Sequence, residues 1–229
     1  MALRQYLAMT ATEMEHTHPL PPAVAYMACH FSPYGLGLAG CPTQLPPDSL
    51  LILNDRMPIH RHDPAQVARE LAELTRRLGC CGVLLDFQRP GSEEVVGAAV
   101  DTLECPVCVT EGYAHGLSCP VLLNPVPVDV CPEDWFARFP DRQLWLEVGL
   151  EAKTVTVTAS GAGEADADAA GDFPHFDSRL CCHYRIDATE QAAVFTLKRT
   201  AEDLSKLLSR AEEYGVLLSI GLFQELGGL

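Results

Sequence analysis

The sequence predicts an α/β fold in which short, buried parallel strands alternate with amphipathic helices. The clearest strand is the run GVLLDFQRP over residues 82–90, where apolar positions lead into polar side chains and a proline ends the run. A helix pattern precedes it over residues 64–78, with the apolar residues on one face. The chain has 229 residues, 48% hydrophobic and 21% charged, and can bury a large core. These observations fit one domain of the size class of α/β barrels, at its short end.

The other elements are predicted from apolar runs and from the turn residues between them. Residues 1–22 are expected to be a lead-in before the first strand. Strands are also predicted over residues 24–31, 49–54, 106–110, 120–123 and 143–149. Asp63 as cap and Pro64 at the first helical position favour a helix start there. Further helices are predicted from Ser92, Glu133 and Thr200.

Two stretches do not fit a regular alternation of strand and helix. About twenty residues separate the strands at 24–31 and 49–54, which is too few for a helix. Either the GLGLAG segment forms a stub strand or one complete βα unit is missing. Residues 159–178 are expected to be a flexible acidic loop. Residues 180–186 and 193–197 alternate in polarity and predict a β-hairpin.

Asp86 and Gln88 are the first candidate site residues. They are two apart, so on a strand they point to the same side, while Leu85 and Phe87 point to the other. The carboxyl ends of the strands are where α/β barrels keep their active sites. A polar plug inside the barrel, bonded only to its neighbours, would explain the same two residues.

The stretch around Asp86 resembles the fourth strand of the family 18 glycoside hydrolases, the chitinase-like barrels. That strand reads D-G-x-D-x-D-x-E-x-P, and residues 81–90 read C-G-V-L-L-D-F-Q-R-P. The glycine, the third aspartate, the aromatic residue and the proline match. Cys81 and Leu84 replace two aspartates, and Gln88 replaces the glutamate that serves the family as general acid. Because an amide has no proton to give near neutral pH, the resemblance implies the fold without the family's reaction.

The end of the chain carries a second resemblance to this family. Residues 195–206 resemble a strand followed by the family's D-D-P-E-S-L-x-x-K helix, and residues 219–227 resemble the final strand that ends W-E-L-G. Gln224 takes the place of the tryptophan that forms the floor of the family's sugar site. The resemblance therefore implies an abbreviated TIM (β/α) barrel with a small β-hairpin insertion before the last βα unit.

The expected function is binding of a carbohydrate or related small ligand without hydrolysis of the family type. The residues expected to bind it are Gln88, His30, Asn54, Glu147, Tyr184 and Gln224. One alternative is an active hydrolase with a rearranged acid pair, Asp86 and Glu111, since glycoside hydrolysis usually requires two carboxyl groups. Another is a scaffold protein whose barrel mouth is filled.

Composition limits the partners and the location that we expect. A formal net charge of −15 disfavours nucleic acid and anionic membrane surfaces, because both require a positive face. The amino terminus has no apolar run of signal-peptide length, so we expect a cytoplasmic protein whose ten cysteines are reduced. No cofactor is expected. No metal site is expected either, because Cys105 and Cys108 would face opposite sides of a strand. The oligomeric state stays open.

Overall fold

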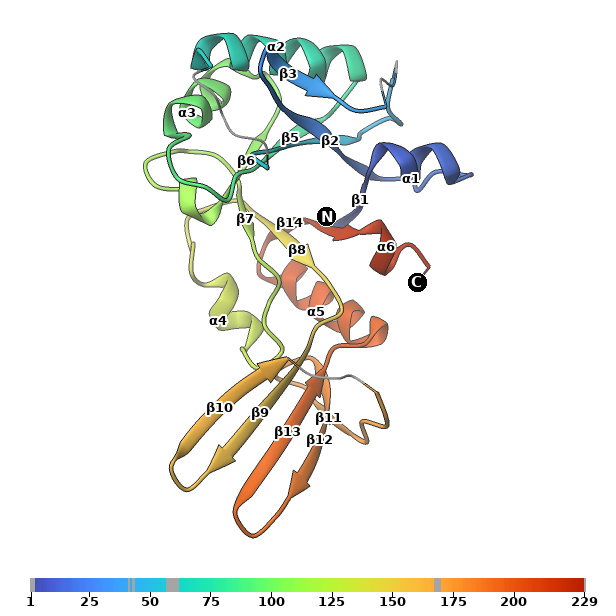
Figure 1. Cartoon of the computed structure of the whole chain (residues 1–229), viewed down its shortest axis with the longest axis vertical. Helices are drawn as coiled ribbons and strands as arrows, with labels where there is room; N and C mark the ends of the chain where they lie inside the picture. Colours follow the sequence, from blue (N-terminus) through green and yellow to red (C-terminus); the bar gives the residue numbers. More distant parts are fainter. Residues whose placement is uncertain (1–2, 41, 43, 57–61, 167–169, 229) are drawn as a thin grey trace.

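The computed structural model describes residues 3–228 except 41, 43, 57–61 and 167–169. The described residues form a closed barrel of eight parallel strands with helices on its outside (Figure 1). In sheet order these strands are β1 (Arg4–Met9), β14 (Val216–Leu222), β8 (Leu144–Val148), β7 (Val121–Leu123), β6 (Val107–Thr110), β5 (Gly82–Asp86), β4 (Leu50–Asn54) and β2 (Val24–Ser32). The barrel closes because β1 pairs with both β14 and β2. The predicted α/β barrel is therefore confirmed.

The start of the chain corrects the expected lead-in. Residues 1–22 contain β1, which is the first barrel strand, and the short helix α1 (Ala11–His16). Sequence patterns miss β1 because it is short and its alternation is subtle: Tyr6 and Ala8 face the barrel interior, whereas charged or polar residues hold its first two positions. With β1 counted, β5 is the fourth parallel strand along the chain, as in the family that it resembles.

The stub-strand alternative explains the short connection between β2 and β4. Strand β3 (Gly35–Leu38) folds back antiparallel on β2 and takes the place of a helix. Its backbone is tied to α2 (Pro64–Leu78), because the amide of Leu36 donates to Oε2 of Glu70 at 2.8 Å. The connection therefore lacks a helix, but the closed barrel lacks no strand.

Capping residues set the ends of the longer helices. Asp63 caps α2 by accepting a bond from the Ala65 amide at 3.2 Å, and Gly79 ends it with a φ of 73°. Thr200 and Asp203 form a capping box at the start of α5 (Ala201–Glu213). The other helices are α3 (Glu93–Thr102), the 3-10 turn η1 (Glu111–Tyr113), α4 (Pro132–Phe136) and α6 (Phe223–Leu226).

A second, antiparallel sheet is inserted between β8 and α5 and projects from the barrel (Figure 1). Its strands in order are β10 (Gly161–Asp166), β9 (Ala152–Thr158), β13 (Ala192–Lys198), β12 (Cys182–Ala188) and β11 (His175–Asp177). The predicted hairpin is β12 with β13. The expected flexible loop over residues 159–178 instead contributes β10 and β11, because backbone pairing with β9 and β12 needs no large side chains. The insertion is thus larger than predicted.

Strand alternation divides the barrel residues into two cores. Leu85 and Phe87 point outward and pack beneath the helices, as predicted. Ile52, Leu84 and Trp145 point inward and fill the barrel interior with other apolar side chains. This filled interior forms the floor beneath the carboxyl ends of the strands.

Candidate functional site

Polar side chains form the layer directly above this apolar floor. Asn54 stands two residues beyond Ile52 on β4, Asp86 two beyond Leu84 on β5, and Glu147 two beyond Trp145 on β8. Because side chains alternate along a strand, each of these polar groups faces the same interior one layer higher. Asn54 and Asp86 also lie side by side in the parallel register.

These groups line a cavity of about 280 Å³ at the carboxyl ends of the strands. The rim and floor are formed by Ala8, Thr10, Met27, Ile52, Asn54, Arg56, Leu84, Asp86, Leu122, Glu147, Ile220, Gly221 and Leu222. An apolar floor with a few convergent polar groups is the usual composition of a small-ligand site. We refer to this space as the mouth cavity.

Asp86 and Gln88 are joined by a direct hydrogen bond. The amide Nε2 of Gln88 donates to Oδ1 of Asp86 at 2.7 Å. An ionised carboxylate only accepts, so the amide must present its nitrogen to Asp86, and its carbonyl oxygen is left for another donor. Asp86 is half-buried and Gln88 is exposed beside the mouth cavity. The predicted same-side placement of the two residues is observed.

The backbone that carries Gln88 is held on both sides. Oδ2 of the buried Asp55 accepts from the amides of Gln88 at 3.0 Å and Arg89 at 2.8 Å. The hydroxyl of Tyr113 donates to the carbonyl of Arg89, and that of Thr110 donates to the carbonyl of Phe87 at 2.7 Å. These contacts position Gln88. Sequence reasoning assigned Asp55 no role, although its place at the end of a strand was a usable signal.

Glu147 is the other carboxyl group of the mouth cavity. It is half-buried on β8, three strands from β5 in the sheet order. Burial raises the pKa of Glu147, and the negative charges of Asp86, Glu151 and Glu225 raise it further. The cavity therefore holds two carboxyl groups in different environments, one of which resists ionisation.

Two of the predicted residues lie elsewhere on the barrel. Glu111 is in η1, outside the mouth cavity, where its Oε1 accepts from Nη1 of Arg138 at 3.1 Å in an ion pair. His30 pairs with Gly37 of β3, and its ring takes the space that a side chain at Gly37 would need. The structure therefore brings Asp86 together with Glu147 and does not bring it together with Glu111.

The remaining two predicted residues come from segments outside the cavity lining. Gln224 is exposed on α6 near Glu13, which caps α1 at Thr10. Tyr184 belongs to the inserted sheet, where its ring lies 5.2 Å from that of His175. Neither Gln224 nor Tyr184 lines the mouth cavity.

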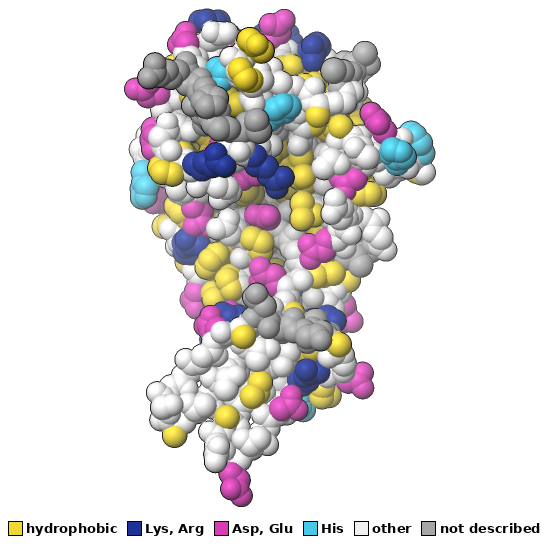
Figure 2. All heavy atoms as spheres, in the orientation of Figure 1, with side chains coloured by type: hydrophobic (Ala, Val, Ile, Leu, Met, Phe, Trp, Pro, Cys, Tyr) yellow, Lys and Arg dark blue, Asp and Glu magenta, His cyan; other side chains and the backbone are white. Residues whose placement is uncertain are grey.

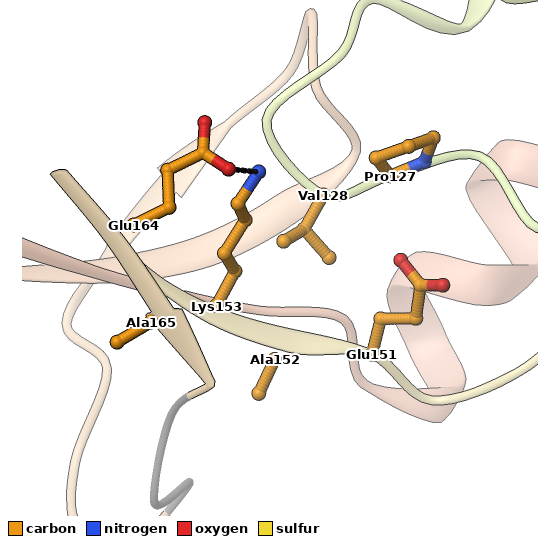
Figure 3. Close-up of a pocket in the computed structure, with 7 residues that line it drawn as sticks. All are labelled: Pro127, Val128, Glu151, Ala152, Lys153, Glu164 and Ala165. Atoms are coloured by element: carbon orange, nitrogen blue, oxygen red, sulfur yellow. Dashed lines mark ion pairs between the residues drawn. The ribbon is translucent and has the colours of Figure 1, made fainter.

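A second, larger hollow lies where the inserted sheet meets the barrel (Figure 3). It measures about 580 Å³ and is lined by Pro127, Val128, Glu151, Ala152, Lys153, Glu164 and Ala165. Lys153 points toward Glu164 at 2.8 Å and also reaches Asp129 at 2.7 Å. Its cation is therefore already paired within the protein. The mouth cavity is the better candidate site, since its polar groups converge at the ends of the barrel strands.

Within the described part of the chain, no group of three or more His, Cys, Asp or Glu residues is arranged to hold a metal ion. Cys108 packs inside the barrel and Cys105 against the outer core, so the two thiols face opposite sides as predicted. Among the helices formed by the described residues, none has the length and apolar character needed to span a membrane.

Comparison with known proteins finds similarity in structure alone. No family model matches the sequence, and no curated protein does. An N-acetylglucosaminidase of glycoside hydrolase family 18 from Paenibacillus barengoltzii matches with a TM-score of 0.62 at 8% identity, over 98% of this chain and 95% of that one. The spore cortex-lytic enzyme SleL of Bacillus cereus matches with a TM-score of 0.55 at 9% identity, over 96% and 70%.

A third match is a class V chitinase from Nicotiana tobaccum, solved as a glutamate-to-glutamine mutant in complex with NAG4. It has a TM-score of 0.55 and 9% identity, and the match covers 96% of this chain and 93% of that one. At these identities the comparisons establish the fold: the chain resembles the chitinase-like barrels of glycoside hydrolase family 18.

Proposed function

We propose that this protein binds an oligosaccharide at the carboxyl ends of its barrel strands and does not hydrolyse it by the mechanism of family 18. The observation that carries the proposal is the Gln88–Asp86 pair. An amide stands where the family motif has its general acid, while the neighbouring aspartate and a cavity next to it are retained.

The chemistry of the mouth cavity suits a sugar. Its apolar floor can accept the face of a pyranose ring, and Asn54, Asp86 and Glu147 offer both acceptors and donors for hydroxyl groups. A volume of about 280 Å³ leaves room for little more than one ring, so further sugar units would extend past Gln88 into solvent. The tobacco chitinase that matches this fold was solved with a glutamate changed to glutamine and with NAG4 bound, which supports binding without turnover.

Binding is tested by thermal unfolding in the presence of N-acetylglucosamine oligomers. A ligand at a hundred times its dissociation constant stabilises a fold by about 2.7 kcal/mol, which raises the Tm of a chain of this size by about 5–10 °C. We expect Asp86→Leu to remove the shift. Glu111→Gln is the matched control, because Glu111 lies outside the cavity, and it is expected to keep the shift. No shift in the unmodified protein across sugars of several classes would overturn the proposal.

A second candidate is a hydrolase that uses Asp86 and Glu147. The observation favouring it is that both carboxyl groups face one cavity and that burial and charge raise the pKa of Glu147. A protonated acid and an ionised partner are what glycoside hydrolysis requires. Slow release of chromophore from an aryl chitobioside by the unmodified protein, abolished in Glu147→Gln, would establish this activity. No release, together with a ligand-induced shift, leaves the binding function.

A further inference from the structure

Two arginines stand at the rim of the mouth cavity. Arg56 follows β4 and lines the cavity, and Arg89 follows β5 one residue beyond Gln88. Nη2 of Arg89 donates to the carbonyl oxygen of Arg56 at 3.1 Å, so the two residues are in direct contact. Figure 2 shows basic side chains gathered beside acidic ones on the barrel half, so positive charge is local on this acidic protein.

The backbone of Arg56 and Arg89 is held by hydrogen bonds to neighbouring residues of the site. The amide of Arg56 donates to Oδ1 of Asn54 at 3.2 Å, and the amide of Arg89 donates to the carboxylate of Asp55 at 2.8 Å. Asp55 is buried, and its Oδ2 is occupied by the amides of Gln88 and Arg89. It holds the loop, and among the described residues it forms no ion pair with a guanidinium.

The guanidinium groups of Arg56 and Arg89 keep N–H donors that are available to a ligand. Among the described residues, neither Arg56 nor Arg89 forms an ion pair with a carboxylate. One carboxylate of the cavity, Asp86, is bonded to the Gln88 amide. The other carboxyl group of the cavity, Glu147, comes from β8, three strands away from β5. Both arginines are exposed beside the cavity, and the planar donor fork of a guanidinium matches a carboxylate.

We propose that Arg56 and Arg89 select a glycan that carries a carboxylate on, or next to, the sugar ring held in the mouth cavity. This inference rests on the proposed binding function and names the class of ligand. The ring lies over the apolar floor, and the carboxylate reaches outward to the two guanidinium groups, away from Asp86. A neutral sugar fills the same cavity but leaves both arginines to solvent.

The test compares two disaccharides that differ in one carboxylate. In N-acetylglucosaminyl-N-acetylmuramic acid, the second ring of chitobiose carries a lactyl group that ends in a carboxylate. We expect the acid to bind the full-length protein about tenfold more tightly than chitobiose, as measured by titration calorimetry, which corresponds to one charge-assisted contact. The methyl ester of the acid is expected to bind like chitobiose. The preference should also weaken in high salt, because exposed charges are screened.

Variants test whether the two arginines cause the preference for the acidic disaccharide. Arg56→Gln and Arg89→Gln are each expected to reduce the affinity ratio of acid to chitobiose toward one. Arg77→Gln, an exposed arginine on α2, is the matched control and should keep the ratio. Equal binding of both disaccharides by the unmodified protein overturns this inference and leaves the proposed function standing. Binding of neither disaccharide, nor of any other sugar, overturns both.

Discussion

Nε2 of Gln88 lies 2.7 Å from Oδ1 of Asp86, so an amide and a carboxylate share a hydrogen bond where the family motif has two carboxyl groups. Two carboxylates at this separation cannot both ionise, and one of them would hold a proton near neutral pH. The amide replaces that proton with a permanent donor. The amide itself has no proton to transfer near neutral pH.

Restoring the carboxyl group should therefore restore acid catalysis. We expect Gln88→Glu to release chromophore from an aryl chitobioside at a rate about 10²–10⁴-fold above that of the unmodified protein, which is the usual contribution of a general acid. The rate should fall as rising pH removes the shared proton. Gln88→Leu, which fills similar space without an acid, is the control and should stay inactive. An inert Gln88→Glu variant that still binds the sugar would show that the position has lost its alignment with the scissile bond.

The carboxyl group of Glu147 should make stability depend on pH. Burial and the charge of Asp86 raise its pKa in the folded state, so ionisation opposes folding. The unmodified protein is expected to lose stability relative to Glu147→Gln as pH rises above the unfolded value of about 4.3. The two should converge in acid. Thermal unfolding from about pH 4 to 8 measures this, with the exposed Glu190→Gln as the control. A constant difference across that range contradicts the prediction.

Sequence reasoning located the strand that carries Asp86 because its signal is local. Within a few residues, the run that ends in Asp86 indicates a buried strand with a polar carboxyl end. The two-residue period correctly places the side chain of Gln88 on the opposite face from those of Leu85 and Phe87. The carboxyl group that shares the cavity with Asp86 is Glu147, which was predicted only as a ligand-binding residue, whereas the acid pair was predicted with Glu111. Glu111 follows the next strand along the chain, yet the ion pair with Arg138 holds it outside the cavity.

The amino-terminal strand and the inserted sheet show the same limit for the fold. β1 is a barrel strand because β14 and β2 pair with it from opposite ends of the chain. β10 is a strand because β9 pairs with it, although its sequence is small and acidic. Backbone pairing decided both elements, for β1 with the distant β14 and for β10 with the adjacent β9, and residue patterns alone did not indicate it.

Asp203 should stabilise the protein near neutral pH and lose this effect in acid. It is fully buried at the start of α5, where its Oδ2 accepts from Nδ1 of His183 at 2.8 Å and from the amide of Thr200 at 3.0 Å. Burial acts to raise its pKa, but the bonds from His183 and Thr200 outweigh it, and the pKa is lowered. Its contribution to stability is therefore present above the unfolded pKa of about 3.9 and is lost as pH falls through the folded one.

The variant that tests this is Asp203→Asn, which keeps the shape of the cap but cannot ionise. We expect it to be less stable than the unmodified protein at about pH 7, and we expect the difference to shrink as the pH is lowered from about 5. Urea unfolding at several pH values gives the comparison. Asp187→Asn, on an exposed aspartate of β12, is the control. If the difference stays constant with pH, the carboxylate charge is not what stabilises the cap.

Arg199 should be the side chain on which attachment of the inserted sheet depends most. It is only 1% exposed, and its guanidinium donates to the carbonyl oxygens of Val126, Leu180 and Cys181. These carbonyls belong to the loop after β7 and to the turn before β12, so one side chain joins the barrel to the sheet. Removing it leaves these carbonyl groups without this donor in a buried place.

We expect Arg199→Met to lower the free energy of unfolding by at least about 3 kcal/mol, since a buried polar group without a partner costs about 1–3 kcal/mol. Methionine keeps much of the volume, so the loss reports on hydrogen bonding more than on packing. Arg77→Met on the exposed face of α2 should change it by less than about 0.5 kcal/mol. A loss below about 1 kcal/mol for Arg199→Met would mean that water replaces the guanidinium at these carbonyls. The sheet would then be held to the barrel by the apolar contacts of Val128, Cys182 and Leu197 instead.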